Sequence, residues 1–347
     1  MTDKLRNRQW ILARRPSGLS VPEDFEFRQS DFTPPALADG EILVRNVAFI
    51  CAPTIRNWME PPGNSLYPSI PLGSPVFGPS TARVIASANP DFPEGSRVCT
   101  FSKWADFDVI NPANVLVRLI PEGHSFIDAL GPVGMNALTA YFGLLEVGQP
   151  KEGETLLVSG AAGSVGLNAI QIGKIAGCRV IGIAGGADKC AMLMGKAGID
   201  ACIDYKSENV AERIAALCPN GIDVFYDNVG GATLQAAIDN MAKFGRIVLC
   251  GQISGYNADE GEEKIGNIMR LIYGGVRMQG FLASMYADRF PEAMAQLARW
   301  IDEGKLYHRE DIRSGLENLP MTLNALFDGS NEGTLIVRIS EEASETA

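Results

Sequence analysis

The feature that most constrains the fold is the segment Thr155–Gly177, which reads "TLLVSGAAGSVGLNAIQIGKIAG". An apolar run is followed by clustered glycines and then by apolar residues at helical spacing, which predicts a strand that turns tightly into a helix. Within "AAGSVG", Gly163 and Gly166 occupy the second and third glycine positions of the pattern GxGxxG. The second glycine lets backbone N–H groups approach a pyrophosphate, and the third lets the helix lie close to the strand. The segment therefore predicts a dinucleotide-binding unit with the phosphates at the helix N-terminus.

Strand-like and helix-like segments alternate around this unit, from about residue 128 to residue 304. We predict strands over residues 155–159, 179–184, 201–204, 224–227, 246–250 and 276–281. Helical spacing covers residues 164–177, 233–244 and 289–304. Strands that alternate with helices imply a parallel, doubly wound sheet with right-handed crossovers.

The two ends of the chain have a different texture. Residues up to about 125 contain short β-type runs separated by Pro- and Gly-rich turns, and the C-terminal run "GTLIVRI" is similar. We therefore predict an α/β chain in which residues 1–127 and 305–347 form one β-rich domain. Residues 128–304 form the nucleotide-binding domain, inserted between them.

The charge balance bears on the class of partner. Lys and Arg number 30 against 41 Asp and Glu, a net charge of −11. Because nucleic acid and anionic membranes both require a basic face, this balance argues against either as a partner. No apolar run reaches the roughly 18 residues of a membrane span, and the first ten residues lack the apolar core of a signal peptide. We therefore expect a cytoplasmic location.

Cysteine and histidine usage argues against a metal site. The seven cysteines are widely spaced without a CxxC pair, and only two histidines occur. Zinc sites need several such ligands at close spacing. We expect buried free thiols in a reducing compartment, and no structural or catalytic metal.

The end of the second predicted strand indicates which dinucleotide binds. In NAD-binding units an acidic residue about 20 positions after the loop binds the ribose 2′-hydroxyl. Here that strand ends in Gly185 and Gly186, and Lys189 follows. Two glycines leave room for a 2′-phosphate and the lysine supplies a compensating charge, which favours NADP(H). Two alternatives stay open: Lys189 can simply begin a solvated helix, and Tyr205 can lie over the phosphate or be an ordinary half-buried aromatic.

Further candidates follow later strands, because ligands of open α/β sheets bind beyond the carboxyl ends of the strands. Asn228, in "YDNVGG", has a short amide suited to a hydrogen bond with a cofactor, and its alternative role is a turn or cap residue. The segment "CGQISGYN" offers Gly251 for close backbone approach, with Ser254 and Tyr256 as side-chain contacts.

Taken together, these motifs resemble a known family. The segments "GMNALTAYFGL", "SGAAGSVG", "DKCAML", "IDYKS", "YDNVGG", "CGQISGYN", "LIYGGVRMQGF" and "NEGTLIVRI" are similar to the zinc-independent medium-chain dehydrogenases/reductases. Within them the match is to the leukotriene B4 dehydrogenase, prostaglandin reductase and alkenal/one reductase group. The resemblance implies a GroES-like catalytic domain built from both chain ends, a Rossmann domain that binds NADP(H), and a homodimer.

The resemblance also implies roles for individual residues. Lys189 and Tyr205 would bind the 2′-phosphate, Asn331 would contact the cofactor from the C-terminal segment, and Thr139 and Phe281 would lie near the nicotinamide. The full predicted cofactor set is Thr139, Ala162, Gly163, Val165, Gly166, Gly185, Lys189, Tyr205, Asn228, Gly251, Ser254, Tyr256, Phe281, Leu282 and Asn331.

The chemistry that the resemblance implies is reduction of a carbon–carbon double bond conjugated to a carbonyl. Hydride from NADPH adds to the β-carbon, and the resulting enolate is stabilised by hydrogen-bond donors without a metal. Tyr273 is the expected donor, with Tyr256 as a second candidate, although Tyr273 can instead be a surface tyrosine of an apolar run. Two other functions stay open: an NADPH quinone reductase, and a crystallin-like or sensor protein that binds NADPH without turnover.

The substrate side departs from the family. Relatives typically read "DPYMR" where this chain has "APTIR", so Thr54 replaces an aromatic residue. The predicted substrate contacts are Thr54, Arg56, Trp58 and Tyr67. Arg56 can hold a substrate carboxylate or form a structural ion pair, and the sequence does not rank the two roles.

Overall fold

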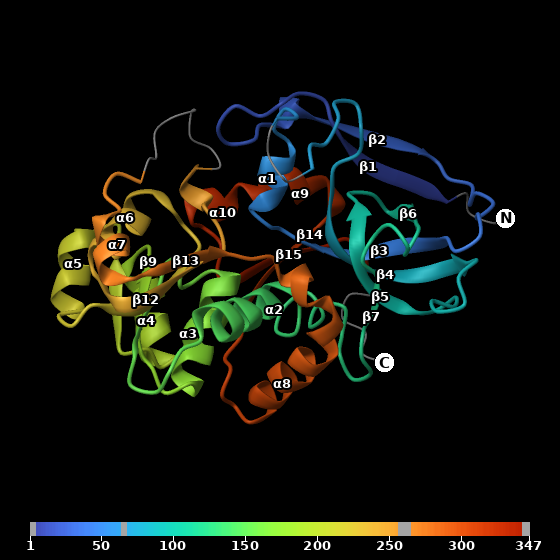
Figure 1. Ribbon diagram of the computed structural model, residues 1–347. Helices are drawn as coiled ribbons and strands as arrows, with labels where there is room; N and C mark the ends of the chain where they lie inside the picture. Colours follow the sequence, from blue (N-terminus) through green and yellow to red (C-terminus); the bar gives the residue numbers. More distant parts are fainter. Residues whose placement is uncertain (1–4, 64–67, 256–264, 342–347) are drawn as a thin grey trace. The chain divides into compact units, whose positions relative to one another are not determined.

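The computed structural model describes residues 5–63, 68–255 and 265–341 (Figure 1). The chain divides into two compact units, one of Met1–Leu130 with Glu310–Ala347 and one of Gly131–Arg309. The second boundary lies five residues beyond the 304/305 position expected from the sequence. The reason is local: the Gln171 amide donates to the Tyr307 carbonyl at 2.9 Å and accepts from its N–H at 2.6 Å. This pair of bonds ties the segment after the last helix to the nucleotide-binding unit.

The nucleotide-binding unit contains a parallel sheet, as the sequence predicted. Its strands are β8 (Thr155–Val158), β9 (Arg179–Ala184), β10 (Ala201–Asp204), β11 (Ile222–Asp227), β12 (Met241–Leu249) and β13 (Arg277–Gly280). The described strands follow the order β10-β9-β8-β11-β12-β13, and neighbours pair in parallel. The chain thus runs outward from β8 to one edge and then returns to build the other half, which is the doubly wound arrangement.

Helices cover both faces of this sheet. They are α2 (Met135–Phe142), the π-helical turn η2 (Gly143–Gly148), α3 (Ser164–Ile175), α4 (Ala187–Gly195), α5 (Val210–Leu217), α6 (Gly231–Asp239), η3 (Ile253–Gly255), α7 (Met269–Gly274), η4 (Ala283–Arg289) and α8 (Phe290–Asp302). Apolar side chains of α5, α6 and α7 pack in one core cluster with strand residues such as Ile181 and Phe225. Strand residues Leu156 and Gly182 face α3 and α4 on the other side.

One predicted helix was too long. Helical spacing suggested a helix over residues 233–244, but α6 ends at Asp239 and β12 begins at Met241. Asn240 lies between them and donates from its amide to the carbonyl of Ala236 at 2.9 Å, which closes the helix. Met241 is fully buried and pairs with Ile222 of β11, so strand pairing overrides the helical spacing there.

The first unit is rich in β-structure. Its elements are β1 (Arg6–Leu12), η1 (Pro22–Asp24), β2 (Phe25–Asp31), β3 (Ile42–Ile50), α1 (Thr54–Trp58), β4 (Phe77–Ser87), β5 (Arg97–Lys103), β6 (Phe107–Ile110), β7 (Arg118–Leu119), β14 (Glu310–Ser314), η5 (Leu316–Asn318), α9 (Leu319–Leu323), α10 (Ala325–Asp328) and β15 (Thr334–Arg338). The main described sheet runs β14-β15-β3-β4-β5-β7, with β6 also on β3, and β1 and β2 form a hairpin. The antiparallel pairing of β15 with β3 unites the two chain ends.

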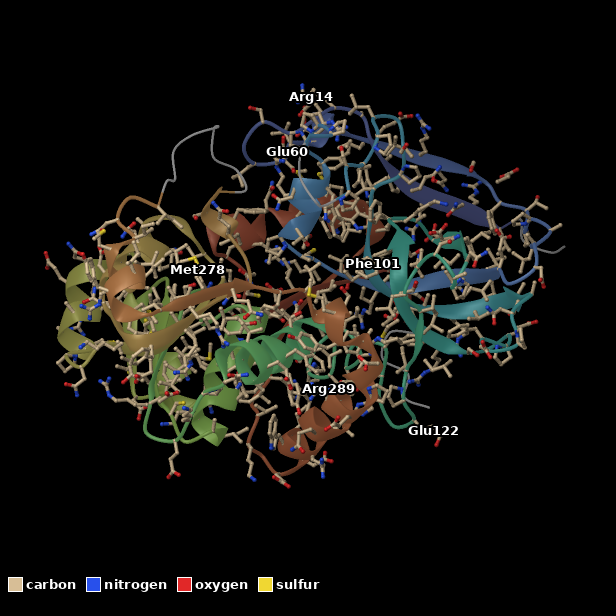
Figure 2. The ribbon with its side chains drawn as sticks, viewed as in Figure 1. Arg14, Glu60, Phe101, Glu122, Met278 and Arg289 are labelled. Carbon is tan, nitrogen blue, oxygen red and sulfur yellow. The ribbon has the colours of Figure 1, made fainter. Side chains whose placement is uncertain are left out.

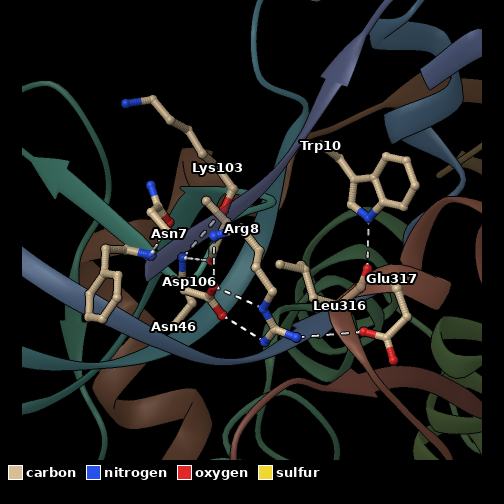
Figure 3. A network of polar contacts seen from close by, with 10 residues as sticks. Asn7, Arg8, Trp10, Asn46, Lys103, Asp106, Leu316 and Glu317 are labelled. Atoms are coloured by element: carbon tan, nitrogen blue, oxygen red, sulfur yellow. Dashed lines mark hydrogen bonds and ion pairs between the residues drawn. The ribbon is translucent and has the colours of Figure 1, made fainter. Parts of the chain in front are cut away.

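A polar network also connects the two ends of the chain within this unit (Figure 3). Arg8 on β1 donates to both carboxylate oxygens of Asp106, at 3.0 and 2.8 Å, and its Nη1 lies 3.7 Å from Glu317. The indole N–H of Trp10 donates to the Leu316 carbonyl at 2.7 Å. Hydrogen bonding to Asp106 raises the pKa of Arg8, so the guanidinium stays charged. The C-terminal segment is therefore an integral part of the β-rich unit.

Candidate cofactor and substrate sites

The glycine-rich loop has the geometry of a phosphate cradle. Gly163 is the N-cap of α3, and its N–H donates to the Gly160 carbonyl at 3.0 Å. A Cβ at Gly166 would lie 2.2 Å from the Gly160 oxygen and 2.8 Å from the Ala161 Cα, so only glycine lets α3 lie this close to the loop. Ala162 is buried and Val165 is half-buried in the same turn. The first N–H groups of a helix have no partner within the helix, so a helix N-terminus of this kind can bind an anion.

The end of β9 is shaped by contacts with the end of β10. A Cβ at Gly185 would lie 2.7 Å from both Cζ and the hydroxyl of Tyr205, so the tyrosine ring lies against the glycine. The Asp204 carboxylate accepts from the Gly186 N–H at 2.7 Å, and this bond, followed by that from Ser207, lowers the pKa of Asp204. Lys189 lies in the first turn of α4, directly after this bend. The structure thus brings Gly185 and Tyr205 together, and it adds Asp204 as the residue that holds their loop.

The ends of β8, β11 and β12 hold the next group of candidates. The side-chain amide of Asn228 donates to the Ser159 carbonyl at 2.7 Å. The Ser254 hydroxyl donates to the Val229 carbonyl at 2.5 Å, and the Gly251 N–H donates to the Asp227 carbonyl at 3.1 Å. Asn228, Gly251 and Ser254 therefore belong to one connected edge of the sheet.

Thr139 and Phe281 meet around Tyr226, a residue that the sequence analysis did not single out. The Tyr226 hydroxyl donates to the Thr139 carbonyl at 3.0 Å, and its ring makes an edge contact with Phe281 at 6.5 Å between centroids. Burial raises the pKa of Tyr226 well above its ordinary value, so this hydroxyl stays protonated and donates. Leu282, the next candidate along the chain, is exposed.

Known proteins share both units of this architecture. A protein-family model described as a zinc-binding dehydrogenase matches residues 164–299. A second family model, described as the N-terminal domain of oxidoreductase, matches residues 8–117. The NADPH-dependent curcumin reductase of Escherichia coli is 40% identical and aligns with 97% of this chain and 98% of its own. This chain belongs to the zinc-independent medium-chain dehydrogenase/reductase family.

Two further proteins are similar to this chain over nearly its whole length. The NADP(+)-dependent 2-alkenal reductase of Nicotiana tabacum is 34% identical, with 99% of this chain and 100% of its own aligned. The crystal structure of CurA from Vibrio vulnificus superposes with a TM-score of 0.89 at 38% identity, over 97% of this chain and 99% of that one. A structure of the same CurA in complex with NADPH gives the same TM-score and identity, over 96% and 99% of the two chains.

The described residues contain no group of three or more His, Cys, Asp or Glu side chains placed to hold a metal ion. Within the same residues, no helix has the length and apolarity needed to cross a membrane.

Tyr273 is the candidate hydrogen-bond donor that lies within the described residues. Tyr273 lies on α7 and is 79% exposed, as the alternative of a surface tyrosine expects. Tyr256 lies outside the described residues, as does the substrate candidate Tyr67. Asn331 is buried in the first unit, where its amide donates to the Gly333 carbonyl at 3.1 Å.

Arg56 has the structural role that the sequence left open. It is only 2% exposed and forms an ion pair with Glu60, the residue labelled at the end of α1 in Figure 2. Its Nε donates to the Gly18 carbonyl at 3.2 Å and its Nη2 to the Pro16 carbonyl at 2.9 Å. All three guanidinium nitrogens therefore have protein partners, as the structural alternative expects.

Trp58, a substrate candidate, packs against two other aromatic rings. Its ring stacks on Phe77 with centroids 5.1 Å apart and an interplanar angle of 19°. It also contacts Phe101 of β5, with ring centroids 6.2 Å apart; Phe101 is labelled in Figure 2. Trp58 is half-buried, whereas Thr54 at the start of α1 is exposed. The three rings form one aromatic cluster within the first unit.

All seven cysteine thiols have a raised pKa. Desolvation raises the pKa of every one of these thiols, to about 12 for Cys51 and Cys250 and about 11 for Cys178 and Cys218. The reactive thiolate is therefore scarce at neutral pH. We expect native protein to react with Ellman's reagent about 100-fold or more slowly than free cysteine, and all seven thiols to react in guanidinium. Rapid reaction of native protein would contradict the raised pKa of these thiols.

Proposed function

We propose that this protein uses NADPH to reduce the carbon–carbon double bond of α,β-unsaturated aldehydes or ketones. The observation that carries the proposal is the 40% identity, over nearly the whole chain, to an NADPH-dependent curcumin reductase, with a 2-alkenal reductase aligned over the same length. NADP(H) as the cofactor agrees with these relatives and with the NADPH complex of the similar CurA. The fit of the chain to this cofactor rests on the glycine cradle at Gly166 and on the turn at Gly185, where the Tyr205 ring lies against the glycine.

Each part of the nucleotide-binding unit has a role in this reaction. NADPH supplies the hydride that adds to the β-carbon of the substrate. The N–H groups at the start of α3 bind the pyrophosphate, and Lys189 and Tyr205 bind the 2′-phosphate. Thr139 and Phe281 border the nicotinamide. A tyrosine hydroxyl, with Tyr273 as the first candidate, donates a hydrogen bond to the carbonyl oxygen as it becomes an enolate, before the α-carbon takes up a proton.

The aromatic cluster of Trp58, Phe77 and Phe101 suits a flat conjugated substrate. Stacked or tilted rings pack favourably against other π-systems, and a half-buried tryptophan offers an apolar wall with little entropy to lose. We therefore propose that Trp58 is a substrate contact and that aryl enones are better substrates than short aliphatic alkenals.

The deciding experiment follows the absorbance of NADPH with purified protein and a panel of 2-alkenals, aryl enones and quinones, with NADH as the control. Turnover of enones with a strong NADPH preference supports the proposal. Turnover of benzo- or naphthoquinones with little enone activity would make the protein a quinone reductase. Tight NADPH binding with no acceptor reduced would make it a binding protein.

Cofactor choice is tested separately at Lys189. We expect Lys189→Ala to raise the KM for NADPH about tenfold, because one charge-assisted contact to the 2′-phosphate is lost. The KM for NADH, which has no such phosphate, stays unchanged. Lys196→Ala, which removes the exposed lysine just after α4, is the matched control and is expected to leave both values unchanged. Equal effects of Lys189→Ala on the two cofactors would refute the phosphate assignment.

We also propose that the protein is a homodimer that associates through the β13 edge. In the described sheet β13 has β12 as its partner, and Met278 lies on this edge strand (Figure 2). Exposed apolar side chains follow on η4 and precede on α7, among them Ile272, Leu282 and Met285. Edge strands and apolar patches both favour association.

Sedimentation velocity tests this proposal. Met285→Glu is expected to shift the protein from dimer to monomer, because a charge would be buried in the interface. Met194→Glu, at a comparably exposed methionine of α4, is expected to stay dimeric. A monomeric wild-type protein would refute the proposal.

A further inference from the structure

A buried polar cluster of Ser159 and Asp227 lies beneath the candidate cofactor edge. Ser159 follows β8 and Asp227 ends β11, and both are 0% exposed. The Ser159 hydroxyl donates to the Asp227 carboxylate at 2.7 Å. Because neither side chain is accessible to a ligand, any influence on the cofactor must pass through the residues that they hold.

Ser159 holds Asn228 at two points. Its hydroxyl oxygen accepts from the Asn228 backbone N–H at 2.8 Å, and its carbonyl accepts from the Asn228 side-chain amide at 2.7 Å. The backbone and the amide of Asn228 are therefore fixed to the same residue at the end of the neighbouring strand.

Asp227 holds the adjoining loops. Its Oδ1 accepts from the N–H groups of Val229 at 3.0 Å and Gly230 at 3.1 Å, which fixes the chain as it enters α6. Its backbone carbonyl accepts from the N–H groups of Cys250 at 2.9 Å and Gly251 at 3.1 Å, at the end of β12. One residue thus connects the loops that carry Asn228 and Gly251.

Burial of a carboxylate away from water costs free energy unless its oxygens accept hydrogen bonds. The Asp227 carboxylate accepts from the Ser159 hydroxyl and from the N–H groups of Val229 and Gly230. Such networks are stronger in a low-dielectric interior and allow one arrangement of the attached loops. This cluster is bonded to Asn228 and Gly251, the candidate cofactor contacts.

We propose that Ser159 and Asp227 are positioning residues for cofactor binding: they preorganise the Asn228 amide and the Gly251 backbone at the sheet edge. The proposal rests on the proposed function in taking NADPH as the ligand, and it takes Asn228 and Gly251 as the residues that contact it. It assigns to Ser159 and Asp227 no contact with the cofactor or the substrate.

The test is a double-mutant cycle on the Kd of NADPH, measured by the fluorescence of the bound cofactor. Ser159→Ala removes only the hydroxyl and is expected to raise the Kd about tenfold, as Asn228→Ala does. Because the hydroxyl acts through Asn228, the double variant is expected to bind no more weakly than Asn228→Ala alone. Asp227→Asn, which replaces the charged acceptor by an isosteric amide, is expected to fall between wild type and Ser159→Ala.

Ser80→Ala is the matched control. Ser80 is also buried, and among the described atoms its hydroxyl has no hydrogen-bond partner, so its loss is expected to leave the Kd unchanged. Thermal unfolding of each variant separates positioning from general stability. Additive effects of Ser159→Ala and Asn228→Ala, or a lowered Tm with an unchanged Kd, would overturn the proposal. Wild-type protein that binds NADPH but reduces no enone would refute the proposed reaction, while the cycle on Kd would still decide the role of Ser159.

Discussion

Replacing Gly166 by alanine is expected to raise the Kd for NADPH by about 100-fold or more. The added Cβ would lie 2.2 Å from the Gly160 carbonyl oxygen and 2.8 Å from the Ala161 Cα. Both atoms belong to the backbone, so no change of rotamer relieves the overlap, and either α3 moves away from β8 or the loop opens. The N–H groups at the start of α3 then no longer converge on the pyrophosphate. Fluorescence titration with NADPH measures the effect.

A matched glycine separates this effect from the general cost of the substitution. Gly195 ends α4, and a Cβ there would meet no atom within 4 Å. Gly195→Ala is expected to leave the Kd unchanged and the Tm unchanged or slightly raised, because alanine is the better helix former. A Gly166→Ala protein with wild-type affinity would show that this loop does not bind the phosphates.

The sheet of the nucleotide-binding unit was predictable because its strands are short apolar runs separated by clear turn signals. Each predicted strand overlaps an observed one, and the sheet is parallel as expected. The helix predicted up to residue 244 failed where spacing and tertiary pairing disagree, since Met241 is buried in strand β12. The β1–β2 hairpin was missed because β2 is polar and mostly exposed, and its sequence carries little alternation.

The candidate site was predictable to the extent that each residue carries a local signal. The role of Gly166 follows from the glycine pattern around it, and the absence of an acidic residue at Gly185 follows from the strand that precedes it. By contrast, the link from Tyr226 to Thr139 spans distant positions in the sequence, and so does the link from Ser159 to Asp227. The one usable signal was a polar side chain at the end of a buried strand, which marks Ser159 and Asp227 but does not say what each one holds.

Gly143→Ala is the second substitution for which we expect a large effect, and here it falls on turnover. Gly143 begins η2, and a Cβ there would lie 2.3 Å from Cζ of Phe281 and 2.7 Å from the Tyr226 hydroxyl. One methyl group therefore displaces Phe281 and disturbs the bond from Tyr226 to Thr139. Phe281 and Thr139 are the two residues assigned to the nicotinamide. Because a misplacement of about 1 Å can reduce the rate by about 100-fold, we expect a loss of that order in kcat.

The expected signature of Gly143→Ala is a low kcat with little change in the Kd for NADPH, since the phosphate loop and the contact of Gly185 with Tyr205 are untouched. Steady-state kinetics at saturating NADPH, together with the fluorescence titration, measures both quantities. In a Phe281→Leu background the smaller side chain removes much of the overlap, so adding Gly143→Ala there is expected to cost far less than it does in the wild type. An equal loss of kcat in the two backgrounds would mean that the clash with Phe281 is not the cause. A loss of NADPH affinity as large as that of Gly166→Ala would mean that Gly143 supports the whole cofactor site and not the nicotinamide side alone.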